Sequence, residues 1–173
     1  MREMMHDGNG EEVGMDVLID LEYSPIQEDG SAIELEFVEA VVKKAISMMD
    51  VPESSEVSVT FIDDDKMADL NEQYRSKSGP TDVLSFECDN LDDDFATDAD
   101  EVYCLGDIVI APDVAYKQSL EYGNTYKEEL ALLLVHGLLH LDGYDHIEDD
   151  EAQIMEDRQK EILSVLSSEI SLA

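Results

Sequence analysis

The chain has few basic residues, few cysteines and no long apolar run, and each shortage excludes a class of protein. It carries 10 lysines and arginines against 44 aspartates and glutamates, a formal net charge of −34 over 173 residues. Such a field attracts divalent cations and opposes a polyanion such as RNA. No stretch reaches the ~20 apolar residues of a membrane helix, and no apolar segment follows Arg2. Neither a membrane span nor a secretion signal is expected.

The two cysteines, Cys88 and Cys104, show neither a CxxC metal spacing nor the numbers of a disulfide framework. We therefore expect reduced thiols in a cytoplasmic protein. The hydrophobic content of 43% and the length of 173 residues favour one globular domain with a sizeable core.

Hydrophobic periodicity predicts one α+β domain over residues 13–173, after a flexible acidic tail at residues 1–12. Strands are expected at 13–21, 57–62, 81–86 and 105–110. Helices are expected at 31–50, 63–74, 112–122, 125–141 and from 148 onward. These elements predict a small mixed four-stranded sheet packed against about five helices.

Several details of the helices can also be predicted. Ser31 to Glu34 and Thr125 to Glu128 have the form of capping boxes at helix starts. Ile154, Ile162, Val165 and Leu166 are expected to form the inward face of the last helix. The segment 89–101, which is acidic and has little hydrophobic periodicity, predicts a solvated loop.

Three of the four histidines, His136, His140 and His146, lie within eleven residues. His136 and His140 are about one helical turn apart, so their rings share a helix face. Gly143 can adopt a positive φ, end the helix and return His146 to the same ion. Three imidazoles without a fourth protein ligand are typical of catalytic zinc, although they also accept nickel. The spacing predicts a zinc site at the end of a buried central helix.

Zinc held in this way lowers the pKa of its bound water towards about 7 and polarises a carbonyl or phosphoryl oxygen. A protease of the HExxH type needs a glutamate where this chain has Gly137. Gly137 either leaves room for a substrate beside the ion or permits close helix packing.

The segment His136-Gly-Leu-Leu-His-Leu-Asp-Gly-Tyr-Asp-His146 resembles the H-G-x-L-H-L-x-G-Y-D-H motif of the YbeY family of bacterial metal-dependent endoribonucleases. The runs T-D-V-L-S-F at 81–86 and L-G-D-I at 105–108 resemble further motifs of that family, as does L-N-x-x-Y-R at 70–75. The resemblance implies an α+β fold, zinc on the three histidines and cleavage of single-stranded RNA. It also implies a role in maturing the 3′ end of small-subunit ribosomal RNA and in ribosome quality control, with RNA and the small subunit as partners and no DNA.

Arg75 matches the family's arginine near the cleft, and a guanidinium suits that place because it can fork onto a phosphate. Otherwise it is a helix-end cation or part of a surface ion pair. Lys77, and less directly Lys43 and Lys44, are further candidates for phosphate contacts.

Asp82 either orients a ligand histidine or caps the sheet edge, and Asp145 allows the same two interpretations. Ser85 is not expected to be a nucleophile, because no base for it is identifiable. Two other functions compete with the endoribonuclease: a metalloprotease-like hydrolase, and a non-catalytic ribosome assembly factor with structural zinc.

Overall fold

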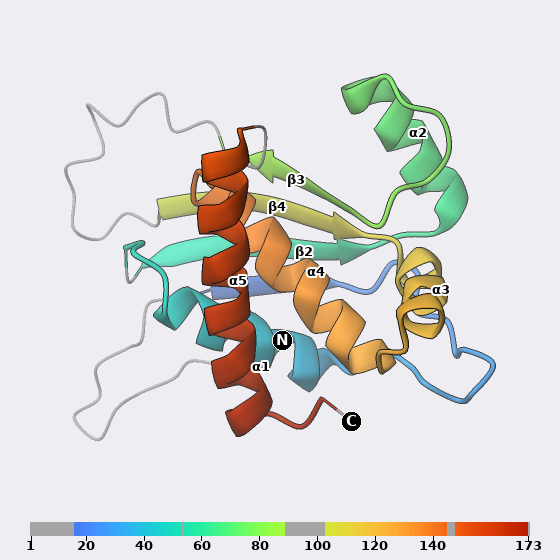
Figure 1. The fold of residues 1–173 in the computed structure, drawn as a ribbon. Helices are drawn as coiled ribbons and strands as arrows, with labels where there is room; N and C mark the ends of the chain where they lie inside the picture. Colours follow the sequence, from blue (N-terminus) through green and yellow to red (C-terminus); the bar gives the residue numbers. More distant parts are fainter. Residues whose placement is uncertain (1–15, 53, 89–102, 145–147, 173) are drawn as a thin grey trace.

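The computed structural model describes residues 16–52, 54–88, 103–144 and 148–172 (Figure 1). The predicted tail 1–12 and acidic loop 89–101 lie outside the described residues. The elements in chain order are β1 Asp16–Asp20, α1 Leu35–Ser47, β2 Ser55–Phe61, α2 Asp64–Arg75, β3 Val83–Glu87, β4 Tyr103–Ile110, α3 Pro112–Tyr122, α4 Tyr126–Leu141 and α5 Asp149–Glu169. This is the predicted α+β class, with the expected five helices and four strands in the described part of the chain.

The strands form one mixed sheet in the order β1-β2-β4-β3. β1, β2 and β4 run parallel, and β3 is antiparallel to β4. In β2 every second residue is fully buried, from Ser55 to Phe61, because alternate side chains of a strand point to opposite faces. The predicted mixed sheet is therefore confirmed.

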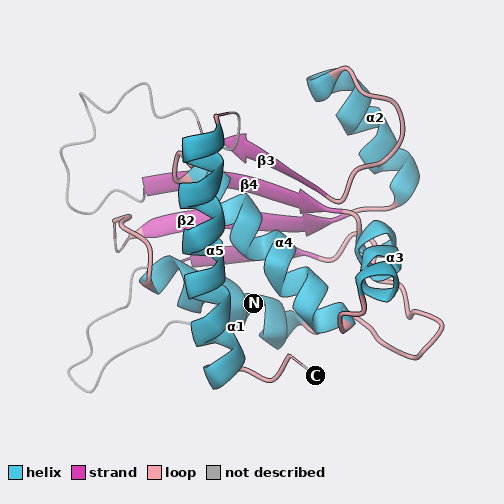
Figure 2. Cartoon of the chain, in the orientation of Figure 1, coloured by secondary structure: helices cyan, strands magenta, loops and turns pink. Residues whose placement is uncertain are grey.

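Helices α1, α4 and α5 cover one face of this sheet (Figure 2). α4 is the central element, and its leucines Leu130, Leu134, Leu138 and Leu139 are at most 1% exposed. Each such side chain contributes roughly 1.5–3 kcal/mol through its burial. The helix also buries the carboxyl of Glu129, and this burial raises its pKa. α4 is thus held on several sides, as its nearly uniform apolar sequence predicts.

The start of α4 confirms the capping box predicted there. The backbone N–H of Glu128 donates to Thr125 Oγ1 at 3.0 Å, and the backbone N–H of Thr125 donates to Glu128 Oε1 at 2.8 Å. These two bonds satisfy donors that have no partner within the helix.

Helix α2 packs on the opposite face of the sheet and builds a second, smaller core. Met67 of α2 is buried there against Leu84 of β3 and Val109 of β4. Asp63 caps the helix by accepting a hydrogen bond from the backbone N–H of Lys66 at 2.9 Å. Because α2 packs against β3, the edge strand of the sheet, its last residue, Arg75, lies near that edge.

The prediction of a capping box at Ser31 is wrong. α1 begins at Leu35, and its N-cap, Glu34, makes no side-chain capping bond. Ser31 belongs to a preceding turn, where its N–H donates to Asp29 Oδ1 at 2.9 Å and its carbonyl accepts from Gln27 N at 2.8 Å. The side-chain bond of this turn comes from Asp29, since aspartate side chains readily accept hydrogen bonds from nearby backbone N–H groups.

The inward face of α5 also differs from the prediction, since Ile154 points outward and Val165 is only half-buried. Ile154 is 59% exposed, whereas its neighbour Met155 is 2% exposed and joins Ile162 and Leu166 in the core. The buried stripe follows Met155 because residues seven and eleven further along lie on the same side of a helix. None of the described helices is both long and apolar enough to cross a membrane.

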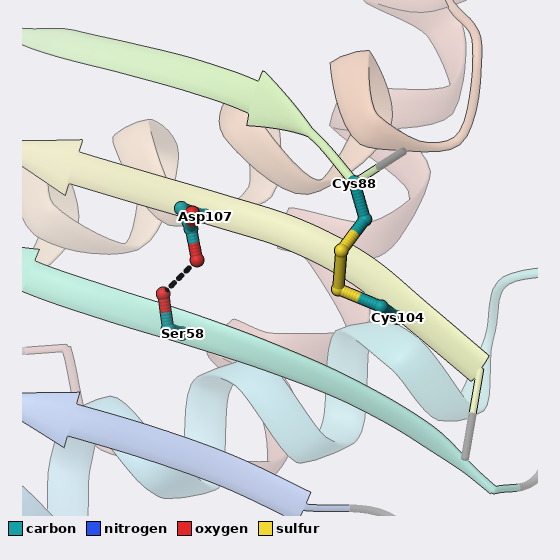
Figure 3. The surroundings of a disulfide bond; sticks show 4 residues. All are labelled: Ser58, Cys88, Cys104 and Asp107. Atoms are coloured by element: carbon teal, nitrogen blue, oxygen red, sulfur yellow. Dashed lines mark hydrogen bonds between the residues drawn. A yellow bond between two sulfur atoms is a disulfide. The ribbon is translucent and has the colours of Figure 1, made fainter. Parts of the chain in front are cut away.

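The expectation of reduced thiols is contradicted by a disulfide between Cys88 and Cys104 (Figure 3). Glu87 pairs with Gly106 in the antiparallel β3–β4 ladder, so Cys88, the residue after Glu87, lies beside the segment of β4 that contains Cys104. This brings the two Cα atoms to 5.7 Å, within the usual range for a disulfide. A sequence separation of 16 residues does not reveal this contact, because it depends on the strand pairing.

We expect reduction of this disulfide to lower the free energy of unfolding by about 3 kcal/mol, the chain-entropy value for a loop of about 15 residues. Urea unfolding of the oxidised protein with and without reductant measures the difference. The double variant Cys88→Ser/Cys104→Ser is the control and should not respond to reductant. Two titratable thiols in the non-reduced native protein would contradict the disulfide.

Candidate active site

His136 and His140 lie side by side near the carboxyl end of α4. Their ring centroids are 4.6 Å apart with an interplanar angle of 82°. The two Nε2 atoms face each other at 3.1 Å. The helical spacing of four residues therefore produces the predicted pair, with the same nitrogen of each ring directed to one point.

The opposite nitrogen of each ring contacts an oxygen. His136 Nδ1 lies 3.0 Å from Gln159 Oε1 of α5, and His140 Nδ1 lies 3.1 Å from the backbone carbonyl oxygen of Tyr144. Both oxygens are acceptors, so each Nδ1 carries the proton and each Nε2 of a neutral ring keeps its lone pair. Gly143, at φ 95°, makes the turn that brings Tyr144 back to His140.

Two lone pairs that face each other at 3.1 Å require a positive charge between them. A shared proton would turn one ring into an imidazolium, whereas a cation would bind both rings. Two nitrogens on one tetrahedral zinc, each at 2.0–2.1 Å, lie about 3.3–3.4 Å apart, close to the separation here. The donor set thus fits a metal.

His146, the third predicted ligand, and Asp145 lie outside the described residues. Within the ranges that the structure describes, no group of three or more histidine, cysteine, aspartate or glutamate side chains could hold a metal.

A pocket of about 630 Å³ opens beside the two histidines. Helix α4 and the turn after it supply one wall, β3 and the residues before it supply another, and the end of α2 supplies Arg75. The pocket is lined by Arg75, Thr81, Asp82, Val83, Leu84, Ser85, Glu87, His136, His140, Gly143 and Tyr144. Residues 61 positions apart in the sequence, Arg75 and His136, therefore share one cavity.

Local contacts bring Arg75 to this pocket. Ser76, in the left-handed conformation at φ 55°, ends α2 directly after Arg75. The buried side chain of Asn71 donates to the carbonyl oxygen of Gly79 at 2.8 Å and holds the following turn against the helix. The ring of Tyr74 packs edge-on against Phe86 of β3, with centroids 5.0 Å apart. The segments 70–75 and 81–86 thus contact each other directly.

Arg75 forms no salt bridge with any described residue, whereas six other basic residues do. Lys43 pairs with Glu39 at 3.0 Å and Lys44 with Glu169 at 2.9 Å, and neither lines the pocket. The suggested phosphate contacts of Lys43 and Lys44 are therefore not supported. Lys77 is exposed and follows Arg75 closely in the chain, but it is not among the lining residues.

Asp82 lines the pocket but does not orient either of the described histidines. Its Oδ1 accepts a hydrogen bond from the backbone N–H of Val83 at 2.7 Å, at the start of β3. Gln159 and the carbonyl of Tyr144 occupy the positions at the histidine Nδ1 atoms. Of the two interpretations, the structure favours the sheet-edge cap.

Gly137 is buried and faces the sheet. A Cβ at this position would lie 3.1 Å from Ile108 Cγ2 and 3.2 Å from Ser85 Oγ. Ser85 Oγ itself donates to the carbonyl oxygen of Gly137 at 3.2 Å. The glycine therefore serves close packing of α4 on β3 and β4, and the serine hydroxyl supports that packing.

Gly106 permits a similarly close approach, here between strands β4 and β3. Its φ is 137°, and a Cβ would lie 2.3 Å from the carbonyl oxygen of Phe86. The L-G-D-I run at 105–108 thus permits β4 to approach β3 at the end nearest the pocket residue Glu87.

Negative charge surrounds the histidine pair. Asp82 and Glu87 line the pocket, and Asp142 caps the end of α4. Burial and the neighbouring Asp50 raise the pKa of the Asp142 carboxyl, against the opposing influence of Arg158. A cation in the pocket would be attracted by the carboxylates of Asp82 and Glu87, which line it.

Comparison with known proteins places the chain in a family. Residues 25–167 match the family described as Endoribonuclease YbeY. The chain belongs to the YbeY family. The four segments that resembled YbeY motifs, 70–75, 81–86, 105–108 and 136–146, all fall within the matched region.

Several curated proteins named Endoribonuclease YbeY are similar over most of their length. The protein from Thermoanaerobacter sp. (strain X514) is 39% identical over 160 residues, 88% of this chain and 98% of the relative. The protein from Geobacillus thermodenitrificans is 41% identical over 138 residues, 78% and 87% of the two chains. The solution structure of a Thermotoga maritima protein aligns with a TM-score of 0.52 and 30% identity, covering 89% of this chain and 90% of the other. The fold of this YbeY family member is thus shared with a solved structure.

We expect Gly137→Glu, which creates an HExxH sequence, to destabilise the protein without producing a protease. The new side chain would enter the packed space beside Ile108 and bury a carboxylate, and large substitutions in a packed interior cost about 1–3 kcal/mol before the charge is counted. Thermal unfolding and cleavage of an unstructured protein are the measurements, with Gly137→Ala as the smaller-volume control. Unchanged stability together with proteolysis would show that residue 137 faces the pocket.

Proposed function

We propose that this chain is a zinc-dependent endoribonuclease, specific for single strands, that acts in the cytoplasm. Its substrate would be the 3′ end of small-subunit ribosomal RNA, with a further role in ribosome quality control on the small subunit. Relatives named Endoribonuclease YbeY, at about 40% identity over most of the chain, support the nuclease activity. The observation that carries the proposal is the convergence of both histidine Nε2 atoms in the pocket that Arg75 lines.

His136 and His140 would bind the zinc through Nε2, and His146 would complete the set, as its sequence spacing indicates. When bound, zinc would supply a Lewis acid for a phosphoryl oxygen and would lower the pKa of water. Nickel or another divalent metal would fit the same imidazoles.

Arg75 would bind and orient the phosphate of the scissile phosphodiester. Its guanidinium offers several donors in a planar fork, which matches phosphate oxygens and can stabilise the charge that develops in phosphoryl transfer. Since Arg75 is not paired with a described carboxylate, binding a phosphate would break no salt bridge seen in the structure. Asp82 and Glu87 would repel phosphate from their own part of the pocket. The attraction for RNA would then be confined to the space near the zinc and Arg75.

The two competing functions have less support. A metalloprotease-like hydrolase needs a glutamate at position 137, where the residue is a glycine packed against the sheet. A non-catalytic assembly factor with structural zinc would need neither the open pocket beside the histidines nor an arginine in it. The experiments below separate both from the endoribonuclease.

We expect His140→Ala to lose zinc and RNA cleavage while keeping its far-ultraviolet circular dichroism, because two ligands cannot hold the ion as three do. Metal analysis and cleavage of a single-stranded RNA are measured on the same preparation. His6→Ala, outside the histidine cluster in the sequence, is the matched control and should stay active, whereas cleavage by a zinc-free His140→Ala preparation would reveal contaminating ribonuclease. Global unfolding of His140→Ala would favour the structural-zinc alternative.

We expect Arg75→Ala to keep its zinc and to lose about 10²–10³-fold in kcat, the typical cost of removing one group that stabilises transition-state charge. Lys117→Ala is the matched control, since Lys117 is an exposed cation outside the pocket. Single-turnover cleavage measures both variants. Wild-type activity of Arg75→Ala would remove Arg75 from the mechanism.

A further inference from the structure

Helix α5 carries a half-buried polar residue, Gln159, on the side of its buried stripe. Met155, Ile162 and Leu166 are 2%, 0% and 0% exposed, and all three belong to the main core. Gln159 lies four residues after Met155 and three before Ile162, so it falls on the same side of the helix. A polar amide beside the core favours a hydrogen-bond partner within the protein, because a polar group that is shielded from water and left unpaired lowers stability.

The partner of Gln159 is a predicted metal ligand. Its Oε1 lies 3.0 Å from His136 Nδ1, across the α4–α5 interface. In this arrangement the amide oxygen accepts a hydrogen bond from Nδ1–H, which leaves the lone pair of the neutral ring on Nε2, facing His140. The opposite tautomer would place a lone pair against the amide oxygen and a proton at the point where the two rings converge.

The position of Gln159 is held by contacts on either side of it. Arg158 donates hydrogen bonds to the carbonyl oxygen of Met48 and to Glu161, which joins α5 to the end of α1. Ile162, fully buried, anchors the next turn. The amide is therefore presented to His136 by a fixed helix.

We infer that Gln159 is a positioning residue for the histidine site: it fixes the tautomer and ring orientation of His136 in which Nε2 is available to a cation. The inference rests on the proposed function in so far as that cation is zinc. It assigns to α5, a helix outside the pocket lining, a role in the chemistry of the pocket. Removing the hydrogen-bond partner of a metal-binding histidine typically weakens metal affinity 10- to 100-fold.

The alternative is that Gln159 only satisfies its own hydrogen-bonding needs within the interface. Both interpretations allow Gln159→Met to fold, because methionine has a similar shape and suits an apolar stripe. They differ in two measurable properties, the tautomer of His136 in the metal-free protein and the affinity of the intact site for zinc.

The experiment compares wild type with Gln159→Met, Gln159→Glu and Gln153→Met. Glutamate keeps an acceptor oxygen at the same reach. Gln153 lies on the same helix, where its side chain donates to Asp157 at 2.8 Å in an exposed position, so Gln153→Met is the matched control. Long-range ¹H–¹⁵N correlation spectra of the metal-free full chain report the protonated nitrogen of His136. Competition with a chromophoric chelator reports zinc affinity.

We expect Gln159→Met to lose the defined Nδ1–H tautomer and to bind zinc 10- to 100-fold more weakly, while Gln159→Glu and Gln153→Met stay within about threefold of wild type. If the methionine variant does not fold, Gln159→Ala takes its place in the same comparison. Wild-type affinity and an unchanged tautomer in the acceptor-free variant would overturn the inference. A wild-type chain that binds no zinc would instead refute the proposed metal, and the tautomer spectra would still decide the role of Gln159.

Discussion

The burial of α4 between the sheet and α5 is the constraint on which the site depends. Its leucines enter the core along most of the helix, and Gly137 lets the backbone approach β3 and β4 closely. Since the helix cannot rotate without exposing those leucines, its two histidines are held on the side that faces the pocket. The apolar packing that stabilises the fold therefore also sets the direction of the ring nitrogens.

The pocket is assembled from segments that are far apart in the chain but joined by direct contacts. Tyr74 packs on Phe86, Ser85 bonds to Gly137, and Gly106 lies against the backbone of Phe86. Residues of these motifs therefore both line the pocket and hold its backbone in place. Asp82 and Ser85 do both, because they line the pocket while their hydrogen bonds go to the backbone.

The strong negative charge of the chain and its proposed RNA substrate are compatible if attraction is local. Most described basic side chains are paired with carboxylates, whereas Arg75 is not paired with any described residue. Screening over about 8 Å at physiological salt limits the repulsion from acidic residues on distant surfaces. A small cationic site can then act within an acidic protein.

The sequence by itself determined the fold class, the number of elements, the cap at Thr125 and the pairing of His136 with His140, because these depend on local periodicity and hydrogen bonding. Tertiary structure alone decided the Cys88–Cys104 disulfide, since it results from the antiparallel pairing of β3 with β4. It also decided that Gly137 serves packing and that Gln159 contacts His136 from a helix 23 residues away. In the sequence, Gln159 is recognisable only as a polar residue that interrupts the apolar stripe of α5. The stripe does not show which residue of another helix Gln159 contacts.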